Sequence, residues 1–219
     1  ENKIILFAIS LILSFGLVKV FINLINPPFG WDNLNYHFTF PVEWMKHGNL
    51  NNPLVVSDDP FPTYYPINGS LLFLWLMFPF KNAFLADIGQ LPFFVLSFLA
   101  ILSISRKLNL NQEYSFLAAS LFVIIPNFFK QLQIAYVDIM LGGIFLVALN
   151  FLLGLTKKYS FKDAFLFSLA FGILVGIKTT ALAYGIFLLI PFFYLIFSRK
   201  QMALRLKCRY SVSLFLMIF

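Results

Sequence analysis

Two aspartates and one lysine attract attention because each lies at the border of a long hydrophobic stretch. Asp32 follows the first stretch after the stiff run Pro27–Gly30, Asp138 opens a later stretch, and Lys178 lies between two others. A carboxylate held at a membrane face, beside low-dielectric surroundings, suits a general base. A lysine in the same position offers a point charge to a phosphate. The set therefore offers a general base and a positive charge suited to a phosphate.

Each of these residues also has a plainer interpretation. Asp32 and Asp138 both stand before a helical run, where an aspartate commonly caps the helix. Lys178 would then be a snorkelling lysine at a helical hairpin. Chemistry is favoured because two of only nine acidic residues meet on one side of the membrane at helix starts. His37 and His47 lie in the same loop without a metal-ligand spacing, so we expect surface or hydrogen-bonding roles for them.

Membrane helices are the elements that must position these residues. Hydrophobic residues make up 60% of the chain and charged residues 11%, and the mean hydropathy is +0.86. An ordinary soluble domain carries about 25% charge, so the composition predicts an all-α polytopic membrane protein. The net charge of +7 does not indicate a nucleic-acid partner, because the positive residues cluster between hydrophobic spans. Cys208 is the only cysteine, which leaves no disulfide framework.

The hydropathy pattern predicts seven spans, the last of them truncated. They are Ile4–Ile25, Ala83–Ser105, Tyr114–Phe129, Ile134–Leu155, Phe165–Ile177, Ala181–Phe197 and a stretch that starts at Tyr210. The apolar block Ile67–Phe80 is only about 14 residues long, short for a span, so we expect it to stay at the interface on the side of the first loop. Because the chain stops inside an apolar run, we expect residues 1–219 to be the N-terminal part of a longer protein.

This arrangement also predicts which side each loop faces. Eleven of the sixteen Lys and Arg residues then lie on one side, which the positive-inside rule makes the cytoplasm. The N-terminus is therefore expected in the cytoplasm and the loop over residues 26–82 outside the plasma membrane. Within that loop we expect an amphipathic helix over Asn35–Gly48, with an apolar face of Phe38, Val42 and Met45 and the interface-seeking rings of Tyr36 and Trp44.

In their order along the chain, these landmarks resemble the N-terminal half of the GT-C superfamily of membrane glycosyltransferases. The nearer relatives are the protein O-mannosyltransferases, the lipid A aminoarabinose transferases and the bacterial family-39-type enzymes. The resemblance covers nearly the whole chain. It rests on Gly30–His37, Trp44, Gly48–Leu50, Tyr64–Pro66, Ala135–Asp138 and Gly172–Lys178.

The resemblance implies a catalytic aspartate in the first outer loop and a second acidic residue in the next, and Asp32 and Asp138 match these positions. It implies a polyprenyl-phosphate-linked sugar donor and transfer outside the cytoplasm with inversion, to a lipid, glycan or protein acceptor. Asp32 would deprotonate the acceptor hydroxyl. The expected substrate-binding residues are Tyr36, His37, Tyr64, Tyr65 and, as our own choice for the carrier phosphate, Lys178.

One departure from the family pattern concerns metals. Many relatives place a second acid beside the first, whereas here Asn33 follows Asp32. No cofactor is therefore indicated, and dependence on a divalent metal stays open. In such families the C-terminal part, expected beyond residue 219, often holds the acceptor-recognition domain.

Two other classes of protein compete with the enzyme. A permease or lipid flippase would use Lys19, Lys178 and Asp138 along a substrate path. An inert scaffold would use the acids only as helix caps. The large outer loop and the lack of an inverted repeat favour the enzyme. The sequence has no phosphate loop, dinucleotide fingerprint, zinc-ligand pairing or nucleophile elbow, which argues against a soluble nucleotide site in this part.

Overall fold

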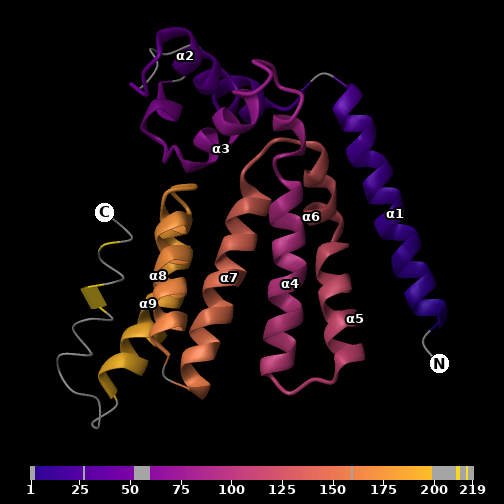
Figure 1. The fold of residues 1–219 in the computed structure, drawn as a ribbon, viewed down its shortest axis with the longest axis vertical. Helices are drawn as coiled ribbons and strands as arrows, with labels where there is room; N and C mark the ends of the chain where they lie inside the picture. Colours follow the sequence, from indigo (N-terminus) through magenta and orange to yellow (C-terminus); the bar gives the residue numbers. More distant parts are fainter. Residues whose placement is uncertain are drawn as a thin grey trace. The chain divides into compact units, whose positions relative to one another are not determined.

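The computed structural model describes residues 3–26, 28–51, 60–158 and 160–198, with single positions at 211, 212 and 216. Every regular element in these ranges is helical, which confirms the all-α class (Figure 1). The chain divides into two compact units, residues 1–95 with 120–140 and residues 96–119 with 141–219. The elements are α1 (Lys3–Ile25), η1 (Asn33–His37), α2 (Thr39–His47), η2 (Phe61–Tyr64), α3 (Asn68–Met77), η3 (Ala86–Ile88), α4 (Leu91–Lys107), α5 (Gln112–Val123), α6 (Pro126–Lys130), η4 (Gln131–Gln133), α7 (Asp138–Lys157), α8 (Phe161–Val175) and α9 (Ala181–Ser198).

Four helical segments of the described chain are long and apolar enough to cross a membrane. They are Ile5–Ile25, Ala86–Lys107, Asp138–Lys157 and Ala181–Ser198. These segments confirm four of the expected spans to within a few residues at each end. The total of seven spans stays a prediction, because α5 and α8 have only 12 and 15 residues. The expected last span from Tyr210 lies almost wholly outside the described residues, as does Asp58 in the first loop.

The single helix expected over Tyr114–Phe129 is wrong. α5 ends at Val123, and a new helix, α6, begins at Pro126. The cause is local, since proline has no N–H to donate and its ring disfavours a helical conformation in the residue before it. Ile125 accordingly leaves the helix, with φ −50° and ψ 125°, and Pro126 takes the first position of α6.

α1 is the longest helix of the first unit. Its 23 residues extend over about 34 Å at a rise of 1.5 Å per residue. Apolar side chains are exposed around most of it, for example Phe7 and Phe21, as expected of a helix that faces lipid. One close approach is at Gly16, where a Cβ would lie 2.5 Å from the ring of Phe129. α2 and α3 gather near the end of α1 where the first loop begins (Figure 1).

The first loop folds into two pieces instead of the single helix expected over Asn35–Gly48. η1 is followed by α2, which ends at Gly48 with a left-handed φ of 66°. The buried face also differs from the expected one: Val42 is exposed, and the rings of Tyr36, Phe40 and Trp44 pack instead against Ile67, Leu71 and Leu74 around α3. Trp44 is not an interface ring, because it is 3% exposed and its indole N–H donates to the Asn51 carbonyl at 2.9 Å.

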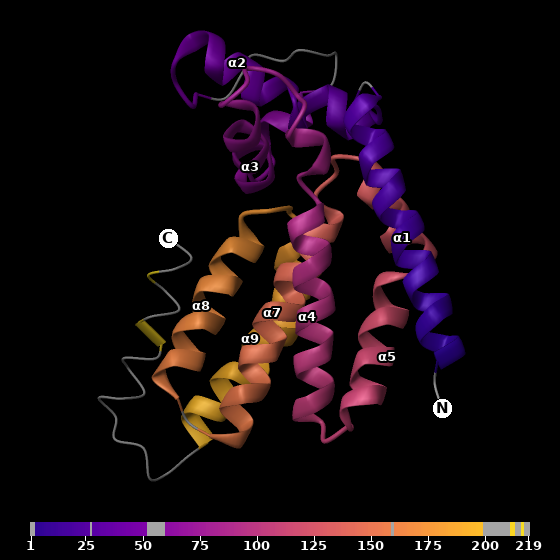
Figure 2. The ribbon, with the colours of Figure 1, turned by 45° about the vertical axis from the view of Figure 1, so that its right-hand side comes forward.

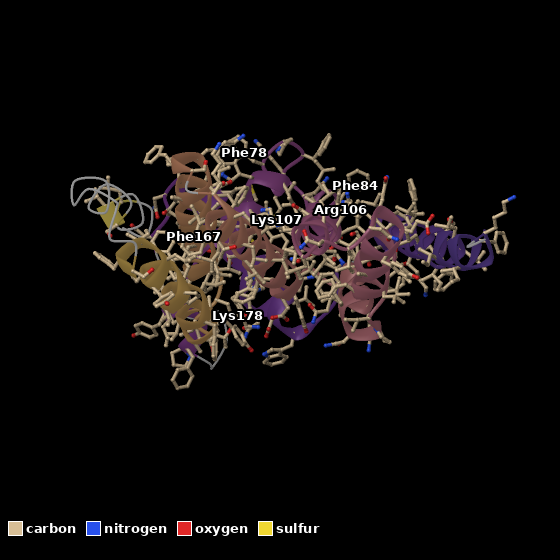
Figure 3. The ribbon with its side chains drawn as sticks, turned by 90° about the horizontal axis from the view of Figure 1, so that it is seen from below. Phe78, Phe84, Arg106, Lys107, Phe167 and Lys178 are labelled. Atoms are coloured by element: carbon tan, nitrogen blue, oxygen red, sulfur yellow. The ribbon has the colours of Figure 1, made fainter. Side chains whose placement is uncertain are left out.

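The second unit contains an antiparallel hairpin of α8 and α9 (Figure 2). Phe167 of α8 (labelled in Figure 3) and Phe192 of α9 are fully buried and stack at a centroid distance of 4.4 Å. Ser160 caps α8 by accepting a hydrogen bond from the Asp163 N–H at 3.3 Å. This cap explains why the helix begins at Phe161, four residues before the expected start.

A partly buried polar contact links α4, α7 and α8 in the second unit. Lys107 Nζ donates to the Asn150 carbonyl at 2.5 Å, and the carboxylate of Asp163 interacts electrostatically with the same ammonium. Gly154 leaves room for the pair, since a Cβ there would lie 3.2 Å from Asp163 Cγ and 3.4 Å from Lys107 Nζ. The arrangement satisfies a lysine that would otherwise be costly inside a membrane helix bundle.

Candidate functional site

The first element of the site is the helical turn that Asp32 introduces. The Phe38 N–H donates to the Asn33 carbonyl at 2.9 Å, a bond between residues five apart, so Asn33–His37 form a π-helical turn. Such turns are rare and occur frequently at functional sites. Asp32 itself has helical backbone angles, and its side chain makes no capping hydrogen bond. The structure therefore excludes the interpretation of Asp32 as a side-chain helix cap.

Tyr36 connects the two aspartates singled out in the sequence. Its hydroxyl donates to the Asp32 carboxylate, and its ring meets Tyr65 edge to face at 5.6 Å. Burial raises the pKa of Tyr36 above its ordinary value, and the charge of Asp32, this hydrogen bond, Tyr65 and the charge of Asp138 raise it further. The charges of Asp32 and Asp138 therefore both reach the Tyr36 side chain, with Asp138 contributing least, which places the two aspartates in the neighbourhood of one buried ring.

Two glycines allow other parts of the first unit to pack closely against the loop before α7, which leads to Asp138. Gly30 has a left-handed φ of 104°, and a Cβ there would lie 3.0 Å from the ring of Tyr136. Gly69, in the first turn of α3, is closer still, since a Cβ would lie 2.3 Å from Val137 Cγ1. The loop is thus fixed between the chain that leads to Asp32 and the start of α3.

Gln90 holds the same loop through both ends of its amide. It is 1% exposed, its Nε2 donates to the Tyr136 carbonyl, and its Oε1 accepts from the Met140 N–H at 3.0 Å. Asp138 lies between these two partners in the sequence and begins α7, where a carboxylate is favoured by the helix dipole. Gln90 was not among the residues expected at the site, although a polar amide at the start of an apolar span is visible in the sequence.

The other expected substrate-binding residues have different surroundings. His37 is buried behind Tyr36, with 4.1 Å between ring centroids, and its Nδ1 hydrogen-bonds Ser70 Oγ at 3.2 Å. This confirms a hydrogen-bonding role for His37. Tyr64 is 83% exposed and lies outside the buried cluster. Lys178 is partly buried in the turn between α8 and α9 of the second unit (Figure 3).

Two other polar residues of the first loop, His47 and Asn33, each make a local hydrogen bond. His47 is exposed, and its Nδ1 donates to the Glu43 carbonyl at 2.9 Å, which confirms the role expected for it. Asn33, the residue beside Asp32, is 1% exposed, and its amide donates to the Phe29 carbonyl at 3.1 Å. Across residues 3–26, 28–51, 60–158 and 160–198, no group of three or more His, Cys, Asp or Glu side chains is placed to hold a metal ion.

These observations define the class of protein before any activity is considered. An all-helical chain with four apolar helices of membrane-spanning length is a membrane protein by composition and length. Comparisons with family models, with curated proteins and with solved structures find no match for this chain.

Proposed function

We propose that this protein is a membrane glycosyltransferase of the GT-C type. It moves a sugar from a polyprenyl-phosphate donor to an acceptor on the extracytoplasmic side of the plasma membrane, with inversion. The observation that carries the proposal is that the charges of Asp32 and Asp138 both reach the buried side chain of Tyr36. Two acids from separate loops in the neighbourhood of one buried ring resemble a site more than two unrelated helix caps.

In the proposed reaction Asp32 takes the proton from the acceptor hydroxyl as general base. The acceptor oxygen attacks the anomeric carbon, the bond from that carbon to the phosphate oxygen breaks, and polyprenyl phosphate leaves with the bonding electrons. A single displacement of this kind inverts the anomeric centre. The hydrogen bond from Tyr36 orients the Asp32 carboxylate, since it fixes one of the two oxygens.

The other residues are assigned around this step. Asp138 is the second catalytic carboxylate and accepts a hydrogen bond from a substrate hydroxyl. Two aromatic rings are available to the sugar. Tyr65 is 42% exposed and contacts the ring of Tyr36, and Tyr64 is also exposed. Lys178 supplies a point charge for the carrier phosphate. His37 acts behind Tyr36 through its contact with that ring.

The proposed topology places the site outside the cytoplasm. The length of α3 supports this topology, because its ten residues cover only about 15 Å and cannot cross a hydrocarbon core of about 30 Å. With α3 at the interface, the remaining spans place most Lys and Arg residues on the cytoplasmic side. The seven-span arrangement and the cytoplasmic N-terminus belong to this proposal.

A transporter or lipid flippase is the second candidate. One observation favours it: Asp87 is 5% exposed at the start of a membrane-spanning segment, and its carboxylate makes no hydrogen bond to the described part of the chain. Buried acids inside membrane segments commonly mark a substrate or proton path. The flippase predicts that carrier lipid crosses vesicle membranes without any acceptor, whereas the enzyme predicts no such flux.

The experiment replaces the proposed base in the intact protein. Asp32→Asn should lower transfer by about 10²–10⁴-fold, the usual contribution of a general base, while membrane expression persists. Synthetic polyprenyl-phosphate-linked hexoses and pentoses serve as donors, and released polyprenyl phosphate is measured. Glu43→Gln is the matched control, because Glu43 is an acid of the same loop that pairs with Lys46 at 2.8 Å. Transfer by Asp32→Asn at the wild-type rate would refute the assignment.

A further inference from the structure

Gln90 is a buried side chain whose hydrogen-bonding capacity is directed at one short loop. It belongs to the turn between η3 and α4 and is 1% exposed. Its donor and its acceptor are both used in long-range bonds, to the Tyr136 carbonyl and to the Met140 N–H. A buried amide whose donor or acceptor lacks a hydrogen-bond partner destabilises the fold. Breaking either bond is therefore unfavourable, and the two bonds together favour a single arrangement of the loop and the amide.

The two partners of Gln90 lie on either side of Asp138, two residues before it and two after it. The Met140 N–H belongs to the first turn of α7, where the backbone donors have no partner inside the helix. A capping carboxylate at the start of the helix would normally bind such a group. Here Gln90 binds it at 3.0 Å, so the first turn of α7 is satisfied from another element.

We propose that Gln90 is a positioning residue that sets the place of Asp138 against Tyr36, an inference that rests on the proposed function. The clamp acts on the backbone at both ends of the segment Tyr136–Met140, so Asp138 cannot shift along or around the axis of α7 without breaking one bond. Substitutions at position 90 remove different parts of this pair of hydrogen bonds. Glutamate keeps the acceptor and loses the donor, and methionine matches the length but loses both.

The test has one arm that does not depend on activity. Hydrogen exchange of peptides over residues 134–141 is measured in the intact protein in nanodiscs. Gln90→Met should raise exchange there at least about tenfold and leave α8 unchanged, and Gln90→Glu should fall between Gln90→Met and wild type. Asn23→Leu is the control, because the buried Asn23 amide donates its hydrogen bond to the Asp87 carbonyl at 3.2 Å in the same unit, and not to this loop. Unchanged exchange, or an increase throughout the protein, would overturn the proposal.

The second arm measures transfer with the donor panel described above. Gln90→Met should lower kcat by about 100-fold, as expected for a catalytic group displaced by about 1 Å, and change KM by less than threefold. Gln90→Glu should recover part of the loss. Equal losses in Gln90→Met and Asn23→Leu would overturn the positioning role, because they would reflect stability alone. Absence of transfer in the wild type with every donor would refute the proposed function, while the exchange arm still decides the role of Gln90.

Discussion

Adding one methyl group at Gly69 is the sharpest perturbation of the site. A Cβ there would lie 2.3 Å from Val137 Cγ1, so the two must separate by roughly 1–1.5 Å to reach ordinary contact. Val137 is 2% exposed and β-branched, so it cannot rotate away cheaply. Overpacking of this kind costs about 1–3 kcal/mol, while alanine recovers about 0.5–1 kcal/mol of helix propensity. Gly69→Ala should therefore lower the free energy of unfolding by about 1–2 kcal/mol.

A double-mutant cycle with Val137→Ala identifies the cause. Val137→Ala removes the clashing methyl, so Gly69→Ala should cost nothing further in that background, and the coupling energy should reach about 1–2 kcal/mol. Stability is measured by thermal unfolding in one detergent. Gly48→Ala is the control: a Cβ there meets nothing within 4 Å, and only its left-handed φ of 66° opposes the change. Val137→Ala should not rescue Gly48→Ala. A Gly69→Ala protein as stable as wild type would refute the reasoning.

Two further predictions concern titratable groups. The pKa of Tyr36 lies above its ordinary value of 10.0, so the unfolded chain loses this proton first. Stability is then unaffected below about pH 10 and falls above it by up to about 1.4 kcal/mol per pH unit. Tyr36→Phe should flatten this decline in melting curves between pH 9 and 11, and Tyr64→Phe should not. Asp87→Asn should raise the free energy of unfolding by about 1–2 kcal/mol, because it replaces a buried ionisable group, whose carboxylate has no hydrogen bond within the described residues, with a neutral amide. A melting temperature lowered by Asp87→Asn would contradict this.

The sequence predicts the long helices well because length and apolar composition alone determine them. Ile4–Ile25 and Ala181–Phe197 were expected within two residues of the observed ends. The first loop was harder, since two apolar sets recur there at helical spacing. Packing against α3 selects Tyr36, Phe40 and Trp44 rather than Val42 and Met45, and this choice depends on a partner helix. The π-helical turn has no signature in the residue types of Asn33–His37.

The candidate site was predictable in part. Asp32 and Asp138 stand out because acids are rare in this chain and both occur at helix starts. What the sequence does not contain is the link between them. Tyr36 joins the two acids through space, and Gln90 reaches partners 46 and 50 residues away. Such long-range bonds leave no periodic pattern along the chain.

The most direct measurement of the central claim is cross-linking between the two acidic positions in oriented vesicles. Asp32→Cys and Asp138→Cys are combined in a Cys208→Ser background, which removes the only cysteine of residues 1–219. A short, membrane-impermeant bifunctional reagent added outside should join the two positions, detected as one linked peptide pair. Failure to link while each single cysteine is labelled, or labelling only from the cytoplasmic side, would contradict a single extracytoplasmic site.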